Sequence, residues 1–313
     1  MDFIAQLQSF LKLIFIYMVP FVLASQGTML GGRTGVFNVA QEGIMLLGSA
    51  VGFLISYNSG NTLLGMLAAS ACGAVFGLAL AYFTTTLKMD QFVVGLALFF
   101  VGFGLHTLIP KLALGITSVL PRIATLSDAP VPLLSQIPFL GDILFNQNAM
   151  VYFSIILSFV LWYFMYKTSP GLEMRSVGEN PMAADSVGVN VGMWRYLTAA
   201  FGGALMGLAG AYIPMVFAGT FTPNIVAGRG WISIALTFFG GWSPLNIMFG
   251  SLFFAGVDSL ASIAQVSGIG IPYQFLLMLP YIATLLVMIF TFRRSRAPAF
   301  LGKNYDREKR ILT

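Results

Sequence analysis

Long apolar runs separated by short polar segments constrain the fold of this chain more than any other feature. A helix that crosses a bilayer needs roughly 20 mostly apolar residues, and in lipid only helices and closed barrels satisfy the backbone hydrogen bonds. The runs are continuous rather than alternating, which favours helices. The expected spans are 10–30, 42–58, 62–86, 92–110, 149–166, 193–218, 225–241, 246–266 and 272–292. We therefore predict an all-α polytopic membrane protein with about 8–9 transmembrane helices.

The composition excludes several other classes of protein. Only 9% of the residues are charged, against about 25% in soluble domains. The single cysteine, Cys72, excludes an internal disulfide and a cysteine-based metal site. The sequence has one histidine and few acids within the apolar runs, which is too little for a catalytic cluster, so we predict no enzyme activity. We expect no signal peptide, because the N-terminal run lacks a cleavage-site pattern.

The distribution of positive charge predicts the orientation. The tail 293–313 is rich in lysine and arginine, which places it in the cytoplasm by the positive-inside rule. Counting spans backwards puts the polar loop 167–192 in the cytoplasm as well and the proline-rich loop 111–148 outside. The run 225–241 is short and contains Arg229, so we expect a broken or re-entrant helix there. Residues 1–313 then form a single transmembrane domain.

Two segments suggest an internal repeat. CGAVFGLALAY (72–82) matches GGALMGLAGAY (202–212) at seven of eleven positions. In the predicted topology the two segments run in opposite directions, which is the plan of an inverted repeat in many transporters. The alternative is that small residues at every fourth position recur in any packed membrane helix. Both interpretations stay open at this point.

The polar loop 167–192 contains the signals of a short helix. Ser169-Pro170-Gly171 is typical of a turn that ends the preceding helix. Asn180-Pro181 predicts a helix start, because asparagine caps and proline suits the first turn. Gly188 is placed to end this helix in a left-handed conformation. A helix of about two turns is marginal in water. It is either a connector on the protein's own surface or a docking helix for a soluble partner.

Polar residues at membrane depth are candidates for a substrate pathway. Asn38, Gln41 and Glu42 follow a break between two apolar runs, and Asp258 lies within the run 246–266. The alternative for Asn38 and Glu42 is that they cap helix 42–58. Arg229 is expected to pair with Asp258 or with Glu42, and the sequence favours neither. Some aromatic side chains are candidates for stacking on a ligand ring, namely Phe37, Phe92, Phe99, Phe100 and Trp231.

Two further polar residues have structural explanations. His106 lies near the end of its span and is expected to be a hydrogen-bonded interface residue rather than a proton relay. Asp90 follows a tight turn and is expected to cap the next helix, although a second contact with a partner is an alternative.

Three segments resemble a known family. GENPMAADSVGVNV (178–191) is similar to the coupling-helix region of ATP-binding cassette (ABC) importer permeases of the branched-chain amino acid/ribose type, and more closely to those for nucleosides and simple sugars. GRTGVFNVAQEGIMLLGSAVGF (32–53) and AGRGWISIALTFFGGWSPLNIMFGSLFFAGVDSL (227–260) resemble its N-terminal and C-terminal signatures. Gln41 departs from the pattern, since an apolar residue is expected before Glu42.

The resemblance implies a permease subunit in a bacterial plasma (inner) membrane. A cytoplasmic ABC ATPase, an extracytoplasmic substrate-binding protein and a second permease subunit, in a heterodimer, would be its partners. ATP and magnesium would bind the ATPase, because this sequence has no GxxxxGK[ST] phosphate loop. We expect no cofactor on this chain. The residues expected to contact the ATPase are Glu179, Asn180, Met182, Ala183, Asp185 and Val187.

The substrate implied by the resemblance is a nucleoside, with a monosaccharide such as ribose or galactose as the alternative. An ion-coupled secondary transporter is an alternative from another class. Such a protein would need several carboxylates on facing helices within the membrane, and only Glu42 and Asp258 qualify. The ABC permease, the secondary transporter and a membrane enzyme can be told apart by experiment. Only the first would need an ATPase for uptake, and only the last would hydrolyse a substrate as an isolated chain.

Overall fold

The computed structural model describes residues 3–115, 121–266, 272–291 and 297–306. The described residues form helices and loops, with two isolated bridges, Arg122–Thr220 and Asp128–Asn148, and no extended strand. The α-helices are α1 Phe3–Gly32, α2 Gln41–Ser59, α3 Thr62–Ala81, α4 Gln91–Leu114, α5 Leu140–Leu144, α6 Ala149–Lys167, α7 Ser169–Glu179, α8 Pro181–Ser186, α9 Val191–Tyr212, α10 Arg229–Phe239, α11 Pro244–Val266 and α12 Tyr273–Thr291. A short 3-10 helix, Leu134–Gln136, lies between α4 and α5.

Six of the described helices are long and apolar enough to cross a membrane. They are Gln6–Gly32, Thr62–Thr86, Gln91–Leu114, Ala149–Lys167, Val191–Ala218 and Pro244–Gln265. The predicted all-α polytopic membrane fold is therefore confirmed. The expected spans 42–58, 225–241 and 272–292 correspond to α2, α10 and α12, which are outside this set of six.

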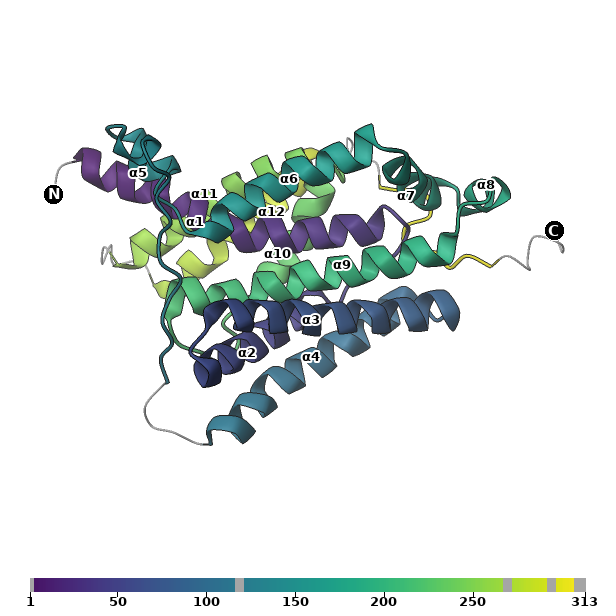
Figure 1. Ribbon diagram of the computed structural model, residues 1–313, viewed down its shortest axis with the longest axis horizontal. Helices are drawn as coiled ribbons and strands as arrows, with labels where there is room; N and C mark the ends of the chain where they lie inside the picture. Colours follow the sequence, from purple (N-terminus) through teal and green to yellow (C-terminus); the bar gives the residue numbers. More distant parts are fainter. Residues whose placement is uncertain (1–2, 116–120, 267–271, 292–296, 307–313) are drawn as a thin grey trace.

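The long helices lie side by side along one axis, and the connections gather at its two ends (Figure 1). The helices α7 and α8 project from one end, where the described tail residues 297–306 also lie. The start of α1 and α5 lie at the opposite end. We call these the α8 end and the α5 end. The loop 167–192 and the described part of the tail thus share one end of the bundle. The described residues 121–148 of the predicted outer loop lie toward the other end, as the predicted topology requires.

The region predicted as span 225–241 is a broken crossing. At the α5 end, Gly219 O accepts a hydrogen bond from Ile123 N (2.8 Å). Irregular chain then leads to α10, which has only 11 residues and at about 1.5 Å per residue is too short to span a bilayer. Just beyond α10, Trp242 O accepts from Arg33 Nε (3.0 Å) and Nη2 (2.7 Å). Burial lowers the pKa of the Arg33 guanidinium in this contact.

Close contact between small residues holds the centre of the bundle together. A Cβ added to Gly73 would meet Gly203 O at 2.1 Å, and one added to Gly203 would meet Gly73 O at 2.2 Å. Only glycine allows two backbones to approach so closely. Four residues further along each helix, Gly77 faces Ala199 and Gly207 faces Ala69 in the same way. This register shows that α3 and α9 pack antiparallel.

The same contact bears on the internal repeat. Gly73 aligns with Gly203 and Gly77 with Gly207 in the matching segments. Each helix also continues into a π-helical turn, Tyr82–Thr86 after α3 and Ile213–Ala218 after α9. Gly73 and Gly203 are equivalent residues that face each other, as expected when a two-fold axis passes between them. The geometry therefore favours an inverted repeat over a chance recurrence of small residues.

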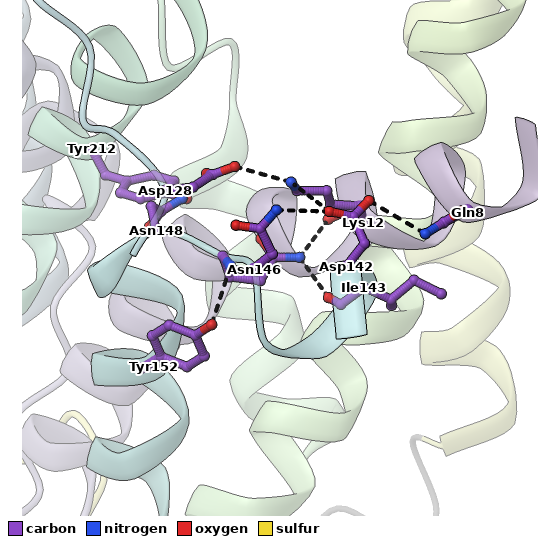
Figure 2. Close-up of polar contacts among 10 residues, drawn as sticks. Gln8, Lys12, Asp128, Asp142, Ile143, Asn146, Asn148, Tyr152 and Tyr212 are labelled. Atoms are coloured by element: carbon purple, nitrogen blue, oxygen red, sulfur yellow. Dashed lines mark hydrogen bonds and ion pairs between the residues drawn. The ribbon is translucent and has the colours of Figure 1, made fainter. Parts of the chain in front are cut away.

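Polar contacts attach the long loop to α1 at the α5 end (Figure 2). Lys12 Nζ lies 3.0 Å from Asp128 Oδ2 and 3.4 Å from Asp142 Oδ1. Asn146 Nδ2 donates to Asp142 Oδ1 (2.8 Å), and Gln8 Nε2 contacts the other carboxylate oxygen at 3.5 Å. The carboxylates of the predicted outer loop are therefore engaged by the first helix.

Candidate functional site

The N-terminus of α10 is the centre of the candidate substrate site, and Glu42 of α2 binds it. Glu42 is buried, and its two oxygens accept hydrogen bonds from Gly228 N (2.9 Å) and Gly230 N (2.7 Å). A carboxylate is stabilised at a helix N-terminus by the unpaired N–H groups and the helix dipole. A Cβ at Gly230 would meet Glu42 Oε2 at 2.6 Å, so glycine is required for this approach.

Glu42 does cap a helix, but not the predicted one. The residue at the N-cap of α2 is Ala40, and no side chain caps that helix. Asn38 Oδ1 instead accepts from Ala40 N (2.9 Å) in the turn before α2. Neither Asn38 nor Glu42 therefore caps helix 42–58 with a side-chain hydrogen bond, although Glu42 does lie in its first turn. The carboxylate reaches the helix start of a segment far along the chain.

Arg229 pairs with Asp258, which settles the open choice of partner. Arg229 Nη2 and Nε lie 2.8 Å and 3.0 Å from Asp258 Oδ2, and Nη1 donates to Val226 O (3.2 Å). Both side chains are mostly buried, so each charge needs its partner. The pair joins the start of α10 to the middle of α11.

These groups line a cavity of about 410 Å³. Glu42, Arg229 and Asp258 form part of its wall. The rings of Phe99 and Trp231 also face it, with centroids 5.4 Å apart in an edge-to-face arrangement. The other side chains that line it include Phe103, Asn224, Gln265 and Tyr281. The volume falls within the range of small-molecule sites, about 300–1,000 Å³.

Not every predicted pathway residue reaches this cavity. Asn38 Nδ2 contacts Met206 Sδ (3.4 Å), and Gln41 Oε1 accepts a hydrogen bond from Thr28, so both pack toward α1 and α9. Gln41 Nε2 is buried and has no partner among the described residues. Contact of Asn38 and Gln41 with a substrate stays a prediction.

The candidate aromatics divide in the same way. Phe99 and Trp231 line the cavity, whereas Phe37 packs edge-to-face on Phe238. The remaining two, Phe92 and Phe100, are largely exposed on α4. Sequence reasoning missed Tyr281, whose hydroxyl donates to Ala227 O (2.9 Å) from α12. Nothing local distinguishes Tyr281 from the other aromatic residues of an apolar helix.

The predicted short helix is present as α8. Asn180 Oδ1 accepts from Ala183 N (3.0 Å), Pro181 is the first helical residue, and Gly188 has φ +90° after the helix end. Val187 is 80% and Met182 44% exposed. Exposed apolar side chains on α8 and directly after it are suited to contact with a protein partner.

The environment of α8 differs from the prediction in one respect. Ser169-Pro170-Gly171 does not form a simple turn but starts α7, with Thr168 Oγ1 accepting from Gly171 N (3.2 Å). Proline in the first turn suits a helix start as well as a stop. The helix α8 therefore follows another helix directly, and its Ala184 is buried against the core.

The other predicted coupling residues point in different directions. Ala183 and Glu179 are exposed, and Glu179 Oε2 accepts from Ala299 N (3.4 Å). Asp185 Oδ2 accepts a hydrogen bond from Tyr305 Oη (3.0 Å).

His106 and Asp90 have the structural roles that the sequence predicts. His106 Nε2 accepts a hydrogen bond from Asn224 N (3.3 Å), and Asp90 Oδ1 caps α4 by accepting from Val93 N (2.9 Å).

The sequence profile of a family described as "Branched-chain amino acid transport system / permease component" matches residues 10–292. The chain belongs to this permease family. It is 35% identical to the nucleoside ABC transporter permease protein NupC of Lactococcus lactis subsp. cremoris, over 99% of this chain and 100% of that protein. Over the same shares it is 34% identical to the guanosine ABC transporter permease protein NupQ of Bacillus subtilis.

A putative glucose ABC transporter permease protein, TsgC13 of Haloferax volcanii, is 30% identical over 92% of this chain and 94% of its own length. No solved structure matches the chain. The family assignment confirms the resemblance seen in the three sequence motifs. The chain is a multi-pass membrane permease subunit.

Proposed function

We propose that this chain forms the translocation pathway of an ABC importer for nucleosides. The observation that carries the proposal is the cavity beside α10, where aromatic rings and hydrogen-bonding groups face the same space. A nucleoside offers a flat base that stacks on rings such as Phe99 or Trp231 and a ribose whose hydroxyls need polar partners. The two relatives with 34–35% identity carry nucleoside and guanosine in their names.

The charges around the cavity suit an uncharged ligand. Arg229 and Asp258 neutralise each other, and the Glu42 carboxylate is held by the N-terminus of α10. Both carboxylates are thus engaged by protein groups, which argues against their use as ion-coupling sites in a secondary transporter. A monosaccharide is the second candidate because of the glucose-named relative. A sugar alone would use the hydroxyl partners but not the full aromatic surface.

The driving force would come from a partner. The chain has no phosphate loop, so a cytoplasmic ATPase with bound ATP and magnesium would dock on α8 through Met182, Ala183 and Val187. An extracytoplasmic binding protein would dock at the α5 end, and a second permease subunit would complete the pathway as a heterodimer. This arrangement requires the α8 end and the tail to face the cytoplasm of a bacterial plasma membrane.

Uptake by the intact importer tests the substrate. Cells that carry the complete transporter are expected to accumulate labelled guanosine, and unlabelled nucleosides are expected to compete while ribose and glucose do not. Deletion of the partner ATPase should abolish the uptake. Competition by sugars alone would reassign the substrate to a monosaccharide, and uptake that persists without the ATPase would favour an ion-coupled transporter.

A further inference from the structure

The described part of the C-terminal tail, residues 297–306, crosses the α8 end of the bundle in contact with several elements (Figure 1). We call this segment the strap. The positive charge of the tail predicts only its side of the membrane. The hydrogen bonds of the strap show that it is also a structural part of the surface that carries α8.

One set of contacts joins the strap to α7 and α8. Phe300 N donates to Gly178 O (2.9 Å), at the C-terminal end of α7. Tyr305 Oη donates to Asp185 Oδ2 (3.0 Å) on α8. The side chains of Leu301 and Tyr305 also pack on the core cluster that includes Ala184. The strap therefore contacts the end of α7 through Phe300 and α8 through Tyr305.

A second set of contacts joins the strap to the membrane helices. Gly302 N donates to Gly35 O (3.1 Å) in the loop that leads to α2. Lys303 O accepts from Arg195 Nη2 of α9 (3.1 Å). Asn304 Nδ2 donates to the carbonyls of Lys88 (2.7 Å) and Met89 (2.9 Å) in the turn before α4. Lys88 Nζ also pairs with Asp306 (2.8 Å).

Gln91 connects the strap with two of the helices that line the cavity, α2 and α4. Its Nε2 donates to Lys303 O (3.3 Å), and its Oε1 accepts from Phe37 N (2.7 Å). Gln91 is the first residue of α4, which contributes Phe99 to the cavity. Phe37 lies in the loop before α2, which contributes Glu42. A continuous series of contacts thus runs from α8 through the strap to α2 and α4, two of the helices that line the cavity.

We propose that the strap transmits movement of α8 to α2 and α4, and that Tyr305 is the positioning residue at its junction with α8. This inference rests on the proposed docking of an ATPase on α8. A segment that contacts two sites couples them only if each site changes the equilibrium position of that segment. The strap contacts α8 through Asp185, and it contacts the start of α4 through Gln91 and the turn before it through Lys88. Movement at either site would therefore shift the strap.

Substitution of Tyr305 by phenylalanine tests this transmission. The change Tyr305→Phe keeps the ring that packs on the core and removes only the hydroxyl that donates to Asp185. The matched control is Tyr163→Phe on the exposed face of α6. The importer is purified through a tag on this chain and reconstituted in liposomes with its binding protein. The measured quantities are guanosine transported, ATP hydrolysed and the amount of ATPase subunit that co-purifies.

We expect Tyr305→Phe to retain the ATPase subunit but to lower the substrate stimulation of ATP hydrolysis by roughly threefold to tenfold, the effect of one lost hydrogen bond on an equilibrium between two states. Transport per ATP should fall in parallel. An unchanged ratio of guanosine transported to ATP hydrolysed, or loss of the ATPase subunit from the complex, would overturn the transmission role. A wild-type importer that moves no guanosine would instead overturn the proposed substrate, and the ratio would then be measured with the substrate found in its place.

Discussion

At the scale of single residues, the role of a side chain can be predicted from the sequence only when its partner lies nearby along the chain. Asn180 and Asp90 cap helices that begin at the next residue, so the sequence predicts both caps correctly. Glu42 lies in the first turn of α2 but binds backbone groups 186 and 188 residues further along the chain. A local pattern holds no information on such a partner. The same limit left the partner of Arg229 open.

Glu42 supplies a prediction at this scale. Glutamine in its place offers one acceptor oxygen and turns an N–H group toward one of the two α10 N–H groups. Loss of a buried charged hydrogen bond costs roughly 1.5–3 kcal/mol. We expect Glu42→Gln to lower the apparent melting temperature in detergent and to raise the KM for uptake. Glu42→Ala, which removes both acceptors, should lower the melting temperature further. A Glu42→Gln variant as stable as the wild type would contradict the capping role.

At the scale of elements, short-range signals predicted α8 but missed α7. The asparagine cap, the proline and the glycine after the helix define α8 within a few residues. The start of α7 has a proline and a glycine that are equally typical of a turn. A Cβ at Gly171 would meet Phe164 O at 2.0 Å, so this glycine is needed where α7 folds back on the end of α6. The tertiary contact, not the local preference, decides that the chain continues as a helix.

The docking role of α8 is tested by a bulky substitution at an exposed position. Ala183 faces away from the core, so Ala183→Trp should leave the fold intact while it blocks the close approach of a partner. We expect normal amounts of the protein in membranes, no co-purification of the ATPase subunit and no uptake. The matched control is Ala149→Trp, also exposed, at the start of α6 near the opposite end. Normal uptake by the Ala183→Trp variant would remove the docking assignment.

At the scale of the whole molecule, the apolar runs predicted the class of fold, and counting them predicted which loops share an end. The loop 167–192 and the tail meet at the α8 end through Tyr305 and Asp185, residues 120 positions apart. The strap itself was not foreseeable, because each of its contacts joins segments distant in sequence. The α3–α9 contact has the same character: the repeat suggests related helices, but only the packing shows that Gly73 meets Gly203.

The absolute orientation of the bundle gives the last prediction. The positive-inside rule predicts that the α8 end faces the cytoplasm. The molecule offers a strongly exposed side chain at each end: Val187, 80% exposed, and Leu133, 82% exposed, in the loop beside α5. With Cys72 replaced by serine, a single cysteine at either position becomes a specific label site. A membrane-impermeant maleimide should label Leu133→Cys in cells with an accessible plasma membrane surface and Val187→Cys only after permeabilisation. The reverse pattern would place α8 outside, where no ATP-driven partner could reach it, and an importer powered from the cytoplasm would then be excluded.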